Sequence, residues 1–436
     1  MLEGDKYLNV FWGEQLTGRL TLKSDRLEFS YSENWLNSNN PPISLSLPKD
    51  DPILCFQNAT AFFINLTYEG LQFQQLSERN NWINLPEYKT IFNHLARYGQ
   101  DCGGALSIFP PYFPVKFLGG NYIKITQQFN NFLQNTNRLL SLPAALENMG
   151  FTVNTSLAGF QDKIPIYRDP SFTDFYLPEL NSLSPTNWIL KAKSERFADI
   201  LFNEFLCLNL ARTIGLETVN CEFIEIGDNP YLLIERYDRY RNSWGFLGRL
   251  HQEDLCQAKT LHPSQKYEHT LGLPYHEFYK LFQSPLFRNG LKCADAFISR
   301  ILFDYIIGNV DGHAKNFSLL YGLDGFVALS PVYDLIAYEI MPFSFSSSLS
   351  IGGEFHYSKV KSKNWLKFSN DMGITSSYLS KKMLLMMENI KNALPVCFKT
   401  KGKPFKYQEL TKKIRKFISE RCQKLRVAAR ELNVLN

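Results

Sequence analysis

An acid, a histidine, a lysine and an amide follow one another closely between Asp311 and Asn316, directly after an apolar segment that ends at Ile307. Asp311 and Asn316 are five residues apart, which is the separation between the base and the metal-holding amide in one type of phosphoryl-transfer loop. There the aspartate accepts or orients a hydroxyl proton, and the amide oxygen reaches a magnesium ion that bridges the phosphates. An ordinary polar helix end holds the same residue types, so the pair becomes informative only together with other features.

A second acid, Asp334, lies eighteen residues after Asn316 and follows the apolar run 326–329. In a kinase, an acid just past a strand and after the catalytic loop is the second magnesium ligand. The usual Phe-Gly pair does not follow Asp334, and a turn or cap residue is the alternative interpretation. Together with Asn316, this acid predicts a magnesium site.

Upstream, the small-residue segment Ala158-Gly159-Phe160-Gln161-Asp162-Lys163 could wrap phosphates with its backbone N–H groups. It is not a GxGxxG pattern, and a tight turn is the alternative. Lys191 ends the apolar run 188–190, where a lysine is costly to bury without an anion. A lysine that snorkels from an edge strand would fit the same pattern. Glu204, on the next predicted helix, is either a partner of Lys191 or part of a solvated helix face.

These residues need a scaffold that alternates strands and helices. We expect a hairpin over 20–31, a helix over 86–97 and otherwise strands and turns in the first hundred residues. The next elements are a helix around 129–149, strands at 164–167, 188–191 and 231–234, and a helix with Phe197, Leu201, Phe205 and Leu208 on one stripe. Beyond about residue 250 the chain is predicted to be mainly helical, with a loop-and-strand stretch between 308 and 334. This order is the layout of a two-lobed nucleotide kinase.

Taken together, these segments resemble the HipA family of serine/threonine kinases, the toxins of bacterial toxin–antitoxin modules. The resemblance spans nearly the whole chain and rests on ordered motifs at 42–48 (PISLSLP), 99–106 (GQDCGGAL), 156–163 (SLAGFQDK), 235–239 (ERYDR), 249–254 (RLHQED), 311–317 (DGHAKNF) and 350–355 (SIGGEF). It implies an α+β, two-lobed, protein-kinase-like fold with an N-terminal β-rich subdomain and an all-α C-terminal lobe. The implied domains are the β-rich subdomain (1–115), a nucleotide-binding N-lobe (116–245) and a helical C-lobe (246–436).

The resemblance also implies a role for each matching residue. Asp311 would be the catalytic base, and Asn316 and Asp334 would take part in catalysis as the magnesium ligands. Lys191 would contact the α- and β-phosphates of ATP. The remaining nucleotide-binding positions would be Ala158, Gly159, Phe160, Gln161, Asp162 and Lys163 over the triphosphate, Glu235, Arg236 and Tyr237 at the adenine, and His313, Ala314, Lys315 and Tyr333 near the phosphates.

In this family a phosphate-loop serine can be autophosphorylated, which ejects the loop and switches the kinase off. Ser156 matches that position, and Thr155 is the alternative. A phosphate there would repel an incoming nucleotide and compete for the same cations. Phe160 stands where a small residue is usual, which would narrow the site. We can assign no chemical role to 252–254 (QED) from the sequence, so we expect a structural role near the activation segment.

The function implied by the resemblance is that of an ATP- and Mg²⁺-dependent serine/threonine kinase that arrests growth as a toxin. Its substrate would be an aminoacyl-tRNA synthetase, with the glutamyl enzyme as the first choice. Its partner would be a HipB-like DNA-binding antitoxin, through which it would meet DNA. The alternative is a binding module with weak or vestigial catalysis that acts mainly as a co-repressor with such an antitoxin.

The charge of the chain is unevenly distributed. The 436 residues include 47 Lys and Arg against 42 Asp and Glu, a net of +5. Segment 399–431 alone holds twelve basic and three acidic residues (+9), which leaves 35 basic and 39 acidic residues (−4) elsewhere. This balance argues against a protein that coats nucleic acid uniformly. The basic segment predicts a helix that either packs on the C-lobe or faces nucleic acid, with Leu410, Ile414, Phe417 or Ile418, Leu425 and Leu432 on its buried stripe and Lys412, Lys413, Arg415, Lys416, Arg421 and Lys424 largely outward.

Cysteine usage and the N-terminus indicate the compartment. The eight cysteines are scattered without a CxxC pair, which favours a reducing cytosol over a disulfide scaffold. Neither a secretory leader nor an apolar run of about 18 residues is visible. We therefore expect a cytoplasmic protein without a membrane span.

Overall fold

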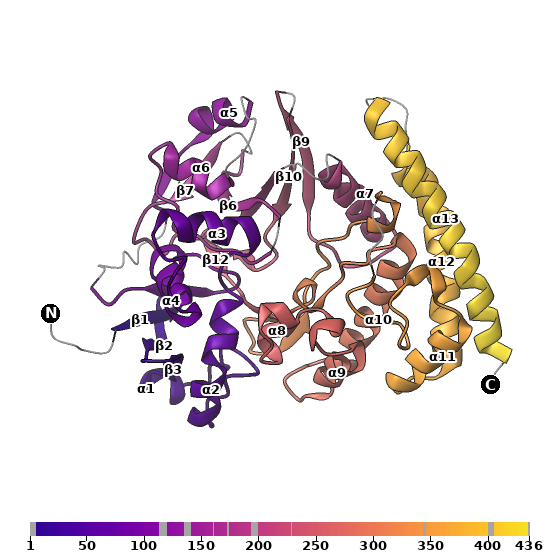
Figure 1. Ribbon diagram of the computed structural model, residues 1–436, viewed down its shortest axis with the longest axis horizontal. Helices are drawn as coiled ribbons and strands as arrows, with labels where there is room; N and C mark the ends of the chain where they lie inside the picture. The colour runs from indigo at the N-terminus through magenta and orange to yellow at the C-terminus, as the bar shows by residue number, and fades with distance from the viewer. Residues whose placement is uncertain are drawn as a thin grey trace. The chain divides into compact units, whose positions relative to one another are not determined.

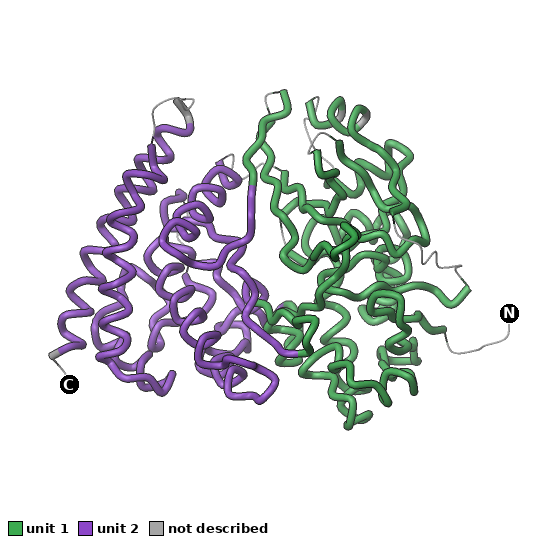
Figure 2. Tube along the Cα trace, turned by 180° about the vertical axis from the view of Figure 1, so that it is seen from behind, with its two compact units in different colours: residues 1–194, 222–263, 318–325 green, residues 195–221, 264–317, 326–436 purple. Residues whose placement is uncertain are grey.

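The computed structural model describes residues 6–112, 120–134, 141–159, 161–171, 174–192, 199–227, 229–342, 346–399 and 405–434. The chain folds into two compact units that alternate along the sequence (Figure 2). Unit 1 comprises residues 1–194, 222–263 and 318–325, and unit 2 comprises residues 195–221, 264–317 and 326–436. The three domains expected from the sequence stay predictions beside this division.

Unit 1 begins with a four-stranded antiparallel sheet in the order β3-β2-β1-β4. Its strands are β1 (Lys6–Trp12), β2 (Gln15–Leu22), β3 (Leu27–Tyr31) and β4 (Leu106–Phe109). Leu22 pairs with Leu27 across the turn, so the hairpin predicted over 20–31 is confirmed. The alternating apolar residues point to one face, where Leu20, Leu27 and Phe29 are fully buried.

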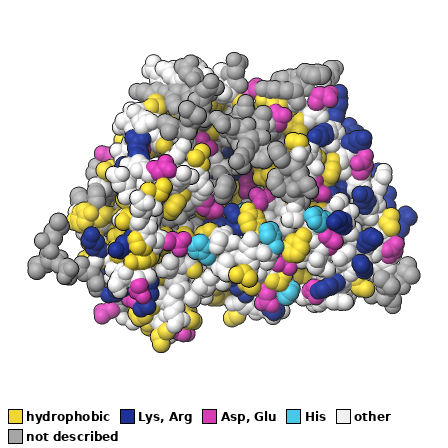
Figure 3. Space-filling model, viewed as in Figure 1, with side chains coloured by type: hydrophobic (Ala, Val, Ile, Leu, Met, Phe, Trp, Pro, Cys, Tyr) yellow, Lys and Arg dark blue, Asp and Glu magenta, His cyan; other side chains and the backbone are white. Residues whose placement is uncertain are grey.

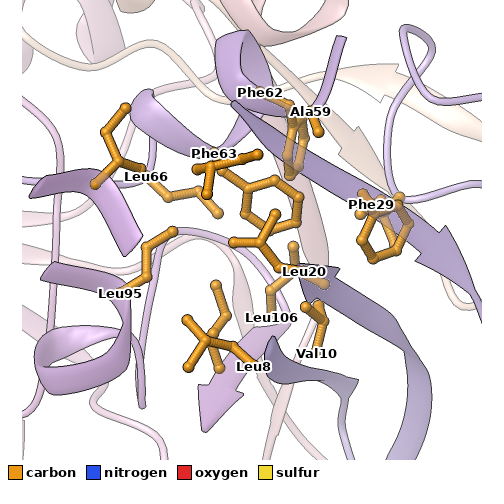
Figure 4. Close-up of a cluster of buried hydrophobic side chains, with 14 of the residues drawn as sticks. Leu8, Val10, Leu20, Phe29, Ala59, Phe62, Phe63, Leu66, Leu95 and Leu106 are labelled. Carbon is orange, nitrogen blue, oxygen red and sulfur yellow. The ribbon is translucent and has the colours of Figure 1, made fainter. Parts of the chain in front are cut away.

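Four helices accompany this sheet: α1 (Glu33–Leu36), α2 (Pro52–Ile64), α3 (Gly70–Arg79) and α4 (Glu87–Tyr98). The helix predicted over 86–97 is confirmed, and so are strands and turns over 6–31, but the same expectation is wrong for 33–79, where α1, α2 and α3 form. The Asp51 side chain caps α2 by accepting from the Leu54 N–H, and Pro52 occupies the first turn. Figure 4 shows Ala59, Phe62 and Phe63 from α2 packed against strand residues in one apolar cluster.

A second sheet of unit 1 has the order β5-β7-β6-β8-β10-β9. It consists of β5 (Tyr122–Lys124), β6 (Lys163–Arg168), β7 (Phe175–Pro178), β8 (Trp188–Ala192), β9 (Cys221–Ile226) and β10 (Asn229–Glu235), which confirms the three predicted strands. The single helix predicted around 129–149 is instead two helices, α5 (Thr126–Gln134) and α6 (Leu142–Asn148), with 135–140 outside the described residues. Short elements complete the unit: β11 (Arg239–Arg241), β12 (Leu247–Arg249), β13 (His251–Asp254), α8 (Leu255–Ala258) and β14 (Ser318–Tyr321).

Unit 2 is mainly helical, as predicted (Figure 1). Its helices are α7 (Ile200–Thr213), α9 (Tyr275–Tyr279), α10 (Gly290–Ile307), α11 (Ser362–Asp371), α12 (Ser376–Cys397) and α13 (Phe405–Val434), and one short strand, β15 (Val327–Leu329), lies among them. Short 3-10 helices are η1 (Pro263–Gln265), η2 (Glu268–Thr270), η3 (Lys280–Gln283), η4 (Ala314–Asn316), η5 (Tyr338–Ile340) and η6 (Tyr357–Lys359). The predicted stripe residue Phe197 lies outside the described residues, whereas Leu201 and Leu208 are fully buried in α7.

The basic segment forms the long helix α13, which runs beside α12 (Figure 1). The predicted buried stripe is confirmed at Ile414, Ile418, Leu425 and Leu432, which are fully buried, whereas Leu410 is half-buried. Figure 3 shows Lys and Arg side chains gathered on the part of the surface that α13 forms. The outward placement of Arg421 is wrong, because this side chain is buried and pairs with Glu339 at 2.6 Å.

Within the described part of the chain, no helix is long and apolar enough to cross a membrane. All eight cysteines are free thiols, five of them buried, so no disulfide contributes to the fold.

Candidate active site

The catalytic loop, residues 308–317, begins where α10 ends in unit 2. Gly308 adopts a left-handed backbone with a φ of 73°. A Cβ at this position would lie 2.8 Å from the ring of Phe417, so only glycine fits. Asn309 turns the chain back, because its backbone N–H donates to the Asp304 carbonyl and its amide donates to the Asp304 carboxylate, both at 2.8 Å. The loop therefore leaves the helix in a fixed direction.

Asn316 and Asp334 are in direct contact. Nδ2 of Asn316 donates to Oδ2 of Asp334 at 2.6 Å, and Oδ1 of Asn316 accepts from the His313 N–H at 3.0 Å. Asp334 has a φ of 57°, a left-handed conformation that is uncommon for residues with a side chain but more accessible to Asp than to most. Amide and carboxylate oxygens are the hard ligands that Mg²⁺ prefers, so the donor types of this pair fit that ion.

Asp311 lies half-buried in the same loop. Its Oδ1 accepts from the Tyr267 hydroxyl at 3.3 Å, and its backbone carbonyl accepts from the His313 N–H at 2.8 Å. Tyr267 was not predicted from the sequence, because nothing in its neighbourhood along the chain marks a tyrosine that meets an acid 44 residues away.

The segment around Asp334 is bound to the catalytic loop at a second point. The Tyr333 hydroxyl donates to the Lys315 carbonyl at 2.8 Å. His313, Ala314 and Lys315 are all buried. The structure thus brings together every residue predicted for the C-terminal part of the site: Asp311, His313, Ala314, Lys315, Asn316, Tyr333 and Asp334.

Arg300 and Asp304, one helical turn apart in α10, support both loops. Nε of Arg300 pairs with Oδ2 of Asp304 at 2.7 Å, and Nη1 of Arg300 donates to the Tyr333 carbonyl at 2.8 Å. Burial raises the pKa of Asp304, and the Arg300 guanidinium and the Asn309 amide oppose that effect. The sequence analysis missed this pair, although two opposite charges at i and i+4 inside an apolar helix are a usable signal.

Unit 1 holds the phosphate loop, residues 156–163. Gly159 has a φ of 118°, and a Cβ there would lie 2.3 Å from Nζ of Lys163, so the ammonium group lies directly over the glycine. The Gly159 N–H donates to Oε1 of Glu69 at 3.1 Å. Ala158 and Gln161 are half-buried, and Phe160 lies outside the described residues. A left-handed glycine N–H beside an ammonium group is a suitable site for an anion.

Asp162 anchors the phosphate loop to the fold. Its Oδ1 accepts from the Leu142 N–H at 2.8 Å and from Nε2 of Gln72 at 3.2 Å. Its backbone carbonyl accepts from the Ala192 N–H at 2.9 Å. These bonds give Asp162 a structural role, and its predicted contact with the nucleotide stays a prediction.

Lys163 and Lys191 lie directly opposite each other on β6 and β8. Lys191 is buried, and β8 lies between β6 and β10, so the alternative of a snorkelling edge-strand lysine is wrong. Like charges in opposite positions of a sheet are unfavourable, and an anionic ligand offsets their repulsion. Glu204 is fully buried in α7, so a solvated face is also wrong for that residue.

The hinge, residues 235–239, follows β10. Glu235 is exposed, and Tyr237 is half-buried with its hydroxyl donating to the Gln252 side chain. The Arg236 N–H donates to the Asn187 carbonyl at 3.0 Å. The Arg236 side chain points into a buried cluster of charges, so its predicted place at the adenine would involve its backbone.

That cluster, the hinge network, contains the buried residues Arg236, Arg239, Arg249, Asp101 and Asp238. Asp101 receives all three guanidinium groups, at 3.2 Å from Arg236, 2.7 Å from Arg239 and 3.1 Å from Arg249. Burial alone would raise the pKa of Asp101, but the three cations hold it well below its usual range.

Ser156 is buried, and its Oγ donates to the Leu66 carbonyl at 2.8 Å. Its backbone N–H donates to the Asp101 carbonyl at 3.2 Å. The alternative position, Thr155, is fully buried as well. Phosphorylation at either residue therefore requires the phosphate loop to move.

Segment 252–254 has structural contacts, as expected. Glu253 is fully buried and accepts from the Ser44 hydroxyl, the Leu45 N–H and the Tyr321 hydroxyl at 2.5, 3.0 and 2.5 Å. Asp254 caps α8 by accepting from the Gln257 N–H at 2.9 Å. Glu253 thus explains why a Ser-Leu-Ser motif occurs near residue 45.

Within the described ranges, no group of three or more His, Cys, Asp and Glu side chains is arranged to hold a metal ion. A magnesium ion at Asn316 and Asp334 would take its other ligands from phosphates and water, which is its usual manner of binding in kinases.

Comparison with known protein families gives two matches on this chain. A model of the HipA-like C-terminal domain matches residues 155–396, and a model of the HipA N-terminal domain matches residues 8–109.

Individual proteins match over most of the chain. Y4mE of Sinorhizobium fredii, which is named as a kinase, is 30% identical over 409 residues, covering 89% of this chain and 91% of its own. The serine/threonine-protein kinase toxin HipA of Shewanella oneidensis is 24% identical over 403 residues, covering 89% and 88%. A solved structure of the Shewanella oneidensis HipA, HipB and operator DNA complex contains a chain that matches with a TM-score of 0.77 at 20% identity, over 95% of this chain and 96% of its own. This likeness confirms the predicted fold class.

Proposed function

The chain belongs to the HipA family of kinases, and we propose that it is a serine/threonine protein kinase that transfers the γ-phosphate of ATP to a cytosolic protein. The observation that carries this proposal is the convergence of Asp311, Asn316 and Asp334 in unit 2. Phosphoryl transfer depends mostly on positioning and charge neutralisation. Asp311 would position the substrate hydroxyl, and Asn316 and Asp334 would hold the Mg²⁺ that neutralises charge on the phosphates.

Each of the three residues has a distinct task in the proposed reaction. Asp311 accepts the proton of the substrate hydroxyl, and its bond to Tyr267 keeps the carboxylate in a fixed position. Asn316 and Asp334 hold Mg²⁺, which neutralises charge on the phosphates when bound. The hydrogen bond from Tyr333 to the Lys315 carbonyl keeps the metal ligands beside the base.

ATP would bind to unit 1 through the phosphate loop and the paired lysines. Gly159 offers a backbone N–H, and Lys163 and Lys191 offer charge for the triphosphate. Glu235 and Tyr237 hold the adenine through the hinge backbone.

The biological role we propose is that of a growth-arresting toxin. Its protein substrate is an aminoacyl-tRNA synthetase, the glutamyl enzyme first, and its phosphorylation stops translation. Autophosphorylation at Ser156 switches the kinase off, since a phosphate in the loop repels ATP.

Transfer of radiolabel from γ-labelled ATP to proteins of a bacterial extract tests the kinase assignment. We expect the Asp311→Asn variant to lose at least about 100-fold in transfer rate, because the amide cannot accept the hydroxyl proton. Asp324→Asn, an exposed acid in unit 1, is the control and should label like the wild type. Equal labelling by Asp311→Asn would exclude Asp311 as the base, and the labelled band in the wild-type reaction identifies the substrate.

A second proposed function is partnership with a HipB-like, DNA-binding antitoxin. The exposed lysines of α13 favour it, because they give one face of unit 2 a strong positive charge. Binding of ATP without any phosphorylated product would favour the variant of this proposal in which catalysis is vestigial.

A further inference from the structure

One short segment of unit 1 contacts the phosphate loop at Ser156, Gly159 and Lys163. Residues 66–72, which we name the clasp, comprise most of the connection between α2 and α3 and the first three residues of α3. The Leu66 carbonyl accepts from Ser156 Oγ at 2.8 Å, and the Tyr68 hydroxyl donates to the Thr155 carbonyl at 2.7 Å. At the other end of the loop, Gln72 Nε2 donates to the Lys163 carbonyl at 2.7 Å. The clasp therefore fixes both the start and the end of the loop.

Glu69 occupies the middle of the clasp and faces the middle of the loop. Its Oε1 accepts from the Gly159 N–H at 3.1 Å. Nζ of Lys163 lies over the same glycine, so a carboxylate and an ammonium group both lie close to Gly159. A carboxylate oxygen and a phosphate oxygen are alike in charge and in the hydrogen bonds they accept.

The Gly159 N–H has a single hydrogen and cannot serve Glu69 and a nucleotide phosphate equally well at the same time. A triphosphate entering the loop would also meet the negative charge of Glu69 at close range. Because Tyr68 is buried and Gln72 is bonded, the backbone on both sides of Glu69 is held in place. The Glu69 side chain is half-buried, so its carboxylate, rather than the backbone of the clasp, is the group that an entering phosphate would displace.

We infer that the Glu69 carboxylate is a built-in stand-in for a nucleotide phosphate, which ATP must displace from Gly159 in order to bind. This inference rests on the proposed use of the phosphate loop for ATP. According to this inference, Glu69, from the N-terminal part of the chain, belongs to the nucleotide site and lowers the affinity for ATP.

The test is an equilibrium titration with a fluorescent ATP analogue and Mg²⁺, followed by competition with unlabelled ATP and with adenosine. Glu69→Ala should bind ATP at least about fivefold more tightly than the wild type, because one charge and one competing hydrogen bond are removed. Glu69→Gln keeps an acceptor but not the charge, so its affinity should fall between the two. Adenosine has no phosphates, and its affinity should be the same for all three proteins. Glu78→Gln, an exposed acid on α3, is the matched control.

Unchanged or weaker ATP binding by Glu69→Ala would overturn the inference. An equal gain for adenosine would do the same, because the effect would then not concern the phosphates. Should Glu69→Ala fail to fold, Glu69→Gln decides by the same criterion. No ATP binding by the wild type is a separate result, and it would contradict the proposed function itself.

Discussion

Arg300 shows how one buried side chain can serve two loops of the candidate active site. Its guanidinium group binds the Asp304 carboxylate and the Tyr333 carbonyl, one residue before Asp334. The Asp304 carboxylate in turn accepts a hydrogen bond from the side-chain amide of Asn309 at the start of the catalytic loop. A planar group with several fixed donors suits this task, whereas a lysine has a single charged centre. The position of Asp334 therefore depends on a residue that touches neither substrate nor metal.

Glu253 should make stability depend on pH. Burial raises its pKa to about 7, partly opposed by the hydrogen bonds from Ser44, Tyr321 and Leu45. Between about pH 4.5 and pH 7 the folded protein keeps a proton that the unfolded chain releases, so the free energy of unfolding falls as pH rises. The loss attributable to this residue is roughly 3 kcal/mol at most, from 1.36 kcal/mol for each pKa unit.

Urea unfolding at several pH values between 5 and 8 measures this effect. The Glu253→Gln variant cannot titrate there, so its stability should decline less than that of the wild type over the same range. Glu78→Gln, in which the removed carboxylate is exposed, should follow the wild type. Identical slopes for the wild type and Glu253→Gln would show that Glu253 stays ionised throughout.

At this scale, sequence reasoning identifies residues by local spacing and misses those with distant partners. Asp311 and Asn316 are separated by five positions, and the loop they form is visible in the sequence. Glu253 accepts a hydrogen bond from Ser44, which is 209 positions away in the sequence, and no local pattern predicts that contact. The resemblance to a known family includes the motif at 42–48, which contains Ser44, and the motif at 249–254, which contains Glu253. It does not predict that these two motifs are in contact.

Asp101 binds both the hinge and the start of the phosphate loop. Replacing it therefore tests how much the connection between these two segments stabilises the protein. Its carboxylate binds the arginines of the hinge network, and its backbone carbonyl binds the Ser156 N–H. Replacement by Asn would leave three buried guanidinium groups with Asp238 as their only carboxylate in the network. We expect Asp101→Asn to lose about 3–5 kcal/mol of stability, since removing one partner leaves charge uncompensated.

Arg249→Met provides the matched comparison in the same network. It leaves two arginines and two aspartates, so the buried charges balance and the loss of stability should be clearly smaller. Thermal and urea unfolding of both variants measure the difference. If Arg249→Met were as unstable as Asp101→Asn, packing rather than charge balance would govern the network.

Helices and strands with a regular pattern of apolar residues can be predicted from the sequence, whereas those whose residues also fit a loop cannot. The hairpin and the strand that contains Lys191 have alternating or continuous apolar residues, and both are confirmed. Helix α2 is missed because prolines and acids near residues 48–52 are typical of loops, although Asp51 and Pro52 are a helix start. Helix α3 is missed as well. Helix α3 contains Gln72 of the clasp, which donates to the Lys163 carbonyl. Because the helix was not predicted, this contact with the phosphate loop was not predicted either.

For the whole molecule, the distribution of charge matters more than its sum. The net charge of +5 combines a terminal segment of +9 with a remainder of −4. Among the side chains of α13 that the structure describes, the exposed charges are Lys412, Lys413, Arg415, Lys416, Lys424, Arg426 and Arg430 against Glu409, Glu420 and Glu431. Seven positive and three negative side chains leave +4 on this surface, while Arg421 is buried and serves the fold. The helix therefore both packs on unit 2 and offers a positive face.

If that face meets DNA in a complex with the proposed antitoxin, binding should depend on salt through α13. Each lysine that neutralises a phosphate contributes about 0.9 to the slope of log affinity against log salt concentration. The variant Lys412→Gln, Lys413→Gln, Lys416→Gln, Lys424→Gln should therefore bind operator DNA more weakly at low salt and with a shallower slope. Lys381→Gln, Lys391→Gln on exposed positions of α12 is the control for general loss of charge. Equal slopes for the α13 variant and the wild type would assign the positive face to packing and solubility alone, since these lysines would then release no counterions from the DNA phosphates.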